Sequence, residues 1–150
     1  MIVAGRITNS WPAWDAEHKY IWTHYNLTVS SAVKGSPGAV VEFAEPGGAL
    51  DGRSTMIAGT VTYAVGDNLV LFLARMPNGY LRTTGWAQGK YALDANGRLH
   101  ANASLGAEAI QANSPSGASS VRTLDGMSIT ELRQRVAARL SAGVNQGKVQ

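Results

Sequence analysis

Residues 66–93 read GDNLVLFLARMPNGYLRTTGWAQGKYAL, and this stretch carries the clearest indication of fold in the chain. Its apolar run at 69–73 has the length of a strand. Because no polar residue alternates with the apolar ones, the run predicts a strand that is buried on both faces. Asn78-Gly79 supplies the positive φ angles of a tight hairpin turn. The stretch therefore predicts the centre of a closed or sandwiched β core.

Other strands are predicted outward from this hairpin by period-two alternation and by turn residues at their ends. In residues 20–33, for example, Ile21, Thr23 and Tyr25 alternate with Trp22 and His24. The full set of predicted strands is 2–8, 20–33, 39–44, 55–63, 69–75, 80–86, 90–93 and 98–101. No helix of crossover length separates them, so we expect a mainly β, antiparallel barrel.

The C-terminal third of the chain differs in composition. Residues 102–126 are small and polar, which predicts a loop or excursion outside the barrel domain of residues 1–101. Ser128 and Glu131 then form a capping-box pattern, and Ile129, Leu132, Val136 and Leu140 form one apolar stripe. We therefore expect an amphipathic α-helix at 127–143, packed on the barrel, and a frayed tail at 144–150.

Composition and charge exclude several classes of protein. The 150 residues, of which 45% are hydrophobic, suit one soluble domain, and no apolar run approaches the ~20 residues of a membrane-spanning helix. The absence of cysteine removes disulfides, thiolate zinc sites and cysteine nucleophiles. Up to Val121 basic and acidic residues are equal, eight of each, and the net charge of +3 arises after that point. A neutral body argues against nucleic-acid binding by the sheet.

The order of these motifs resembles a known group of proteins. The first strand IVAGRIT, the turns at 33–35 and 46–48, the run at 69–73 and the segment GWAQGKY at 85–91 are similar to those of uncharacterised bacterial extracytoplasmic proteins. That group is distantly related to the netrin-like and tissue-metalloprotease-inhibitor barrels. The resemblance implies an OB-like barrel outside the cytoplasm, periplasmic, surface-bound or secreted, that acts by binding. The inhibitors' N-terminal zinc-chelating cysteine has no counterpart here, so their mechanism does not carry over.

The candidate binding residues gather around the first hairpin. They are Trp11, Trp14, His18, Trp22 and His24. Exposed aromatic faces of this kind stack on a glycan, a peptide or a single strand at low entropy cost. The alternative is structural: Trp11 and Trp14 close the mouth of the barrel, and Trp22 packs under the C-terminal helix.

No motif in the chain indicates an enzyme, a metal site or a cofactor. His18 and His24, with Asp15 or Glu17, only loosely match metal-ligand spacing. The glycine-rich turns at 46–48 and 85–89 do not precede helices, as phosphate-binding loops do. We therefore expect a non-enzymatic binding or assembly module whose partner is another protein. Self-association, as a structural subunit of a secreted or surface assembly, and single-stranded nucleic-acid binding are the alternatives.

Overall fold

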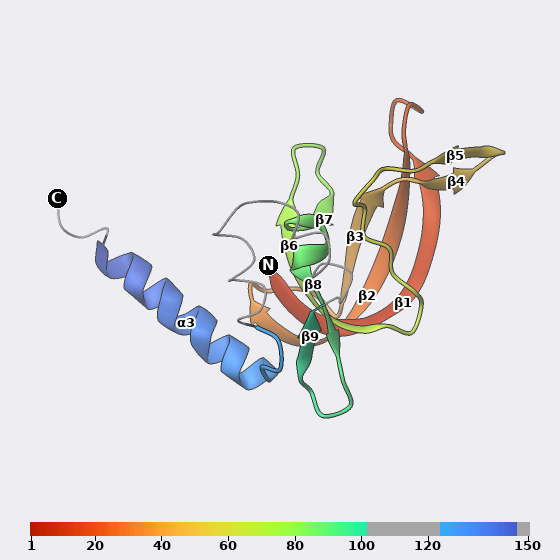
Figure 1. Ribbon diagram of the computed structural model, residues 1–150. Helices are drawn as coiled ribbons and strands as arrows, with labels where there is room; N and C mark the ends of the chain where they lie inside the picture. The colour runs from red at the N-terminus through yellow and green to blue at the C-terminus, as the bar shows by residue number, and fades with distance from the viewer. Residues whose placement is uncertain (102–123, 147–150) are drawn as a thin grey trace.

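The structure is a computed structural model that describes the backbone of residues 1–101 and 124–146 and side chains as far as Ala142 (Figure 1). The predictions for 102–123 and 147–150 lie outside the described residues. The large sheet contains β1 Ile2–Trp14, β2 Ile21–Lys34, β3 Val40–Pro46, β6 Asn68–Arg75, β7 Leu81–Thr83, β8 Lys90–Leu93 and β9 Leu99–Ala101. A separate hairpin joins β4 Gly48–Leu50 to β5 Arg53–Thr55, and the other elements are the 3-10 helix η1 Trp86–Gly89 and the α-helix α3 Ile129–Gln146.

All strand pairs in the described part of the chain are antiparallel, so the predicted mainly β, antiparallel class is confirmed. The strands of the large sheet follow the order β3-β2-β1-β6-β8-β9, and β7 pairs with the remaining part of β6. Figure 1 shows β1 and β2 as long, strongly bent strands within this sheet. Register shifts in β1 accompany the bend, as β-bulges do.

The sheet is not closed into a barrel. β3 and β7 lie near each other at the two sides of the gap, which we call the seam, but no backbone ladder joins them in the described residues. The N–H group of Thr83 instead donates to Oε1 of Glu45, at 2.9 Å. A carboxylate thus takes the place of a main-chain carbonyl, and this side-chain bond connects β3 and β7 where closure was expected.

Strand β6 is buried on both faces, as predicted. Leu69, Leu71 and Leu73 contribute to a first core cluster, with the buried residues of β1, β2 and β3. Val70 points to a second cluster, which also contains Leu99 and Leu132. Two covered faces explain why this strand needs an uninterrupted apolar run.

Three local predictions differ from the structure. Residues 55–63 were expected to be a strand, but beyond β5 they are irregular, and Gly59 has φ +81°. The predicted alternation of buried and exposed side chains is kept, because Val61 and Tyr63 are buried in the first core. The predicted strand 80–86 ends at Thr83, because Gly85 and Trp86 adopt left-handed φ angles. The first strand continues to Trp14, well past the expected end at residue 8.

Helix α3 begins with the predicted capping box. The N–H of Ser128 donates to Oε2 of Glu131 at 2.8 Å, and the N–H of Glu131 donates to Oγ of Ser128 at 3.3 Å. Leu132 is buried in the second core, whereas Leu140 is 49% exposed. Figure 1 shows the helix leaving the sheet beyond its first turns. Among the described residues, only the side chains of its first turns reach apolar partners on the sheet.

Candidate binding surface

A β-bulge determines which face of the sheet Trp11 occupies. Ile7 pairs with Leu27, and both lie in the first core, so regular alternation would also direct Trp11 towards that core. The register shift between Ile7 and Asn9 reverses the alternation, and Trp11 pairs with His24 on the outer face. The two rings stack with centroids 5.4 Å apart and planes at 18°.

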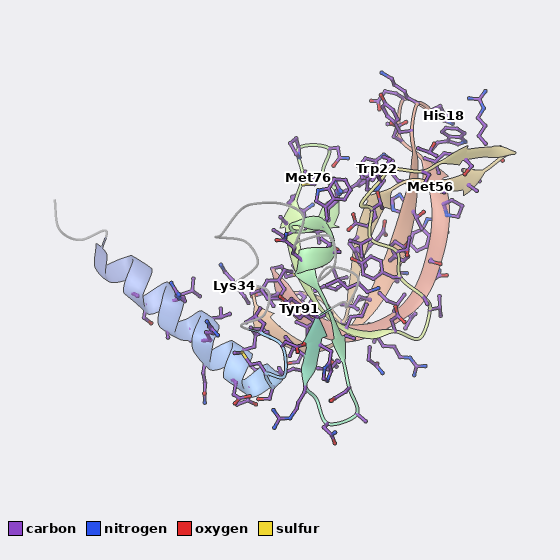
Figure 2. The ribbon with its side chains drawn as sticks, in the orientation of Figure 1. His18, Trp22, Lys34, Met56, Met76 and Tyr91 are labelled. Atoms are coloured by element: carbon purple, nitrogen blue, oxygen red, sulfur yellow. The ribbon has the colours of Figure 1, made fainter. Side chains whose placement is uncertain are left out.

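Further aromatic rings continue this outer face across the seam. Tyr80 meets His24 edge to face at 5.2 Å and Trp22 edge to face at 5.2 Å. The Arg82 guanidinium lies over Trp22 at 5.8 Å and over Trp86 at 5.0 Å. We call this set the aromatic belt: Trp11, Trp22, His24, Tyr80, Arg82 and Trp86. Figure 2 shows Trp22 near the ends of β3 and β7, far from α3, so it does not pack under the helix.

His24 is the support of the aromatic belt. Its residue exposure is 7%, and Nδ1 lies 3.0 Å from Oε1 of Glu42. Nε2 is buried and has no hydrogen-bond partner among the described residues. Rings on two sides and one carboxylate hold the imidazole in place, so it fixes the spacing of Trp11 and Tyr80.

The positive charge in the aromatic belt is paired. Nε and Nη2 of Arg82 lie 3.3 and 3.4 Å from Oε2 of Glu45, whose residue exposure is 1%. Burial raises the pKa of the Glu45 carboxyl, and the bonds from Thr83 and Arg82 oppose that shift. The belt is consequently an apolar, aromatic surface with its one arginine neutralised by a buried acid.

The other two predicted site residues lie elsewhere. Trp14 pairs with buried Ile21, on the opposite face from the aromatic belt, and its Nε1 donates to Oδ2 of Asp51 at 3.1 Å. His18 stacks on Trp14 with centroids 6.4 Å apart, and Figure 2 shows it at the tip of the β1–β2 hairpin. Arg53 covers the Trp14 ring at 5.8 Å. The structure therefore brings Trp11, Trp22 and His24 together and separates Trp14 and His18 from them.

Tyr80, Arg82 and Trp86 were not among the predicted site residues. Alternation already separates Tyr80 and Arg82 from Leu81 and Thr83, which face inward. This signal places the two side chains on the outer face, but their proximity to Trp22 depends on the seam, which no local pattern specifies. The position of Trp86 depends on the left-handed turn at Gly85, which starts η1.

Comparison of the chain with protein-family models, curated proteins and solved structures gives no match. Within residues 1–101 and 124–146, no three His, Asp or Glu side chains converge as metal ligands. No helix in that same part of the chain has the length and apolar character to cross a membrane. Functional inference accordingly rests on the geometry of the belt.

Proposed function

We propose that this protein is a binding module without catalytic activity that recognises another protein through the aromatic belt. The observation that carries the proposal is the gathering of three tryptophans and a tyrosine on one outer face. Trp86 is 41% exposed and Trp11, Trp22 and Tyr80 are half-buried. Tryptophan and tyrosine are the residues that most often anchor protein interfaces.

The contacts within the belt favour binding because they order the rings in advance. Each ring packs on another ring or on the Arg82 guanidinium, so a partner meets side chains that have already lost rotamer freedom. The indole N–H groups of Trp11, Trp22 and Trp86 have no acceptor among the described residues. They are therefore available to carbonyl groups of a partner chain.

The paired charge favours a protein partner over a nucleic acid. Arg82 is neutralised by Glu45, and Glu42 adds a carboxylate beside His24. A single strand would need unpaired basic side chains along its backbone. A gel shift with single-stranded DNA at several salt concentrations tests the alternative of nucleic-acid binding. A tight complex that weakens as salt is added would favour that alternative over a protein partner.

The finer identity of the fold is part of the same proposal. An antiparallel sheet with a C-terminal helix supports the netrin-like, OB-like resemblance, although the seam is open. The extracytoplasmic setting, in the periplasm, at the surface or in a secreted assembly, is proposed from that resemblance alone.

Affinity capture with matched tryptophan variants tests the proposal. The Trp22→Ala/Trp86→Ala variant should bind any partner at least about 30-fold more weakly than the wild type, because interface anchors contribute about 2 kcal/mol or more and each 1.4 kcal/mol is about tenfold. Trp14→Ala removes the same kind of side chain from the opposite face and should leave capture unchanged. Thermal melting of all three proteins checks that each is folded. Equal capture by the double variant would exclude the belt as the interface, and loss with Trp14→Ala alone would move the interface to the hairpin tip.

A further inference from the structure

A cavity of about 400 Å³ opens on the face opposite the aromatic belt. It lies between the ends of β2 and β3 and the irregular segment 55–62. Its lining is largely apolar and includes Tyr25, Pro46, Ile57 and Val61. Met56, at 93% exposure, and Ile57, at 37%, are the large apolar side chains of this segment that solvent reaches. The volume and the lining are those of a small-molecule site.

Gly48 keeps one wall of this cavity thin. Its φ of +139° lies outside the range that other residues readily adopt, and a Cβ there would lie 2.7 Å from Oγ1 of Thr23. That hydroxyl already donates to the carbonyl of Gly47 at 2.8 Å. The glycine pair thus lets the backbone close against β2 without a side chain filling the space.

One polar side chain in the lining has unused hydrogen-bonding capacity. The Thr60 hydroxyl is buried and has no partner within the described residues. It can therefore accept from the donor group of a ligand, and a buried hydroxyl is unfavourable as long as it stays unpaired. The Glu45 carboxylate, by contrast, already receives the N–H of Thr83 and two N–H groups of Arg82.

The charge of the cavity selects an uncharged ligand. Glu45 is the one Asp, Glu, Lys, Arg or His among the described residues that line the cavity, and Arg82 already balances its charge. A cation would meet the repulsion of Arg82, and an anion would meet the carboxylate itself.

We propose that this cavity binds a small, uncharged, mainly aromatic or apolar molecule that carries a hydrogen-bond donor. The apolar body occupies the space under segment 55–62, and the donor reaches the Thr60 hydroxyl. This site lies on the other face of the sheet from the aromatic belt and does not depend on the proposed function.

Fluorescence titration with N-phenyl-1-naphthylamine, which is uncharged, apolar and has one N–H donor, tests the proposal. The wild type should give saturable emission with one probe per chain. Ala58→Trp, which adds a large side chain to the lining, should weaken binding about tenfold or more. Thr60→Val, which keeps the volume and removes the hydroxyl, should weaken it roughly two- to tenfold, the worth of one hydrogen bond. Thr84→Val makes the same change at an exposed threonine outside the cavity and should have no effect.

A second probe separates the donor from the apolar body. 1-Phenylnaphthalene lacks the N–H group, so it should bind the wild type more weakly and should not distinguish wild type from Thr60→Val. Trp86→Ala should bind both probes as the wild type does, which separates this site from the belt. Emission that does not saturate, or that Met56→Ser abolishes while Ala58→Trp leaves it intact, would show adsorption to the exposed segment and overturn the proposal. Melting curves confirm that each variant is folded.

Discussion

Removal of the Glu45 carboxylate should weaken the link between β3 and β7, because this side chain bonds both Thr83 and Arg82. Glu45→Ala leaves the buried N–H of Thr83 without its acceptor, which is unfavourable by about 1–3 kcal/mol. It also leaves Arg82 unpaired. Breaking a fully buried pair is unfavourable by about 3–5 kcal/mol, but the Arg82 side chain is 16% exposed and can turn towards water. We therefore expect a total loss of about 2–4 kcal/mol.

Urea denaturation, followed by tryptophan fluorescence and far-UV circular dichroism, measures this loss. Glu45→Gln retains an acceptor for Thr83 and should lose about 1 kcal/mol, because one neutral hydrogen bond replaces a charge-assisted one. Glu17→Ala, in the exposed β1–β2 turn, is the control and should change stability by less than about 0.5 kcal/mol. If Glu45→Ala is as stable as Glu17→Ala, the carboxylate does not hold the seam.

The same variants test the sign of the pH dependence. The folded-state pKa of Glu45 is raised above its ordinary value of 4.5, so the folded protein binds the proton more tightly than the unfolded chain. The stability that this proton contributes is fully present below pH 4.5 and is lost as the pH rises through the folded-state pKa. The free energy of unfolding of the wild type minus that of Glu45→Gln should thus fall on going from about pH 4 to about pH 8. A difference that grows over this range would mean that the pKa is lowered.

Three further predictions concern the two cores and the helix. Leu71→Ala should lower the free energy of unfolding, measured in urea, by about 2–5 kcal/mol, and Phe72→Ala should lower it less because Phe72 is half-buried. Equal stability of both variants and the wild type would contradict a strand covered on both faces. Ending the chain at Ser128 should leave the β signal in circular dichroism and lower the melting temperature, since Leu132 is buried in the second core. Complete loss of the β signal would show that the helix is required for folding. Glu131→Ala should lower the melting temperature slightly, because the N–H of Ser128 loses its acceptor in the capping box, and an unchanged melting temperature would indicate that water caps the helix equally well.

The sequence was sufficient where local chemistry alone decides the structure. The run at 69–73 has apolar residues at every position, and only a strand with two covered faces accommodates it. Asn78-Gly79 and Ser128 with Glu131 produce the turn and the helix start by bonds within a few residues. These elements needed no knowledge of the rest of the chain.

The rest of the fold depends on contacts between distant residues. Closure of the sheet was expected from the fully apolar run at 69–73 and from the absence of crossover helices. In the structure, the Glu45 side chain instead accepts from the Thr83 backbone across the seam. Segment 55–63 has strand-like alternation because Val61 and Tyr63 fill the first core, although their backbone forms no ladder in the described part.

The candidate site shows the same division. Tryptophan content near the first hairpin pointed to the region where part of the aromatic belt lies, and Trp22 and His24 share a face as alternation predicts. The bulge after Ile7 then moves Trp11 onto that face and leaves Trp14 on the other. One inserted residue reverses every side chain beyond it, and nothing in the local sequence marks the position.

Site-specific photocrosslinking tests the central claim, that the aromatic belt is the interface, most directly. A benzoylphenylalanine residue placed at position 86, in the belt, is compared with one placed at position 14, on the opposite face, in cells that produce the protein. We predict that irradiation joins the protein to one discrete partner from position 86, and that Trp22→Ala in the same chain abolishes this product. Crosslinking from position 14 with none from position 86 would contradict the account.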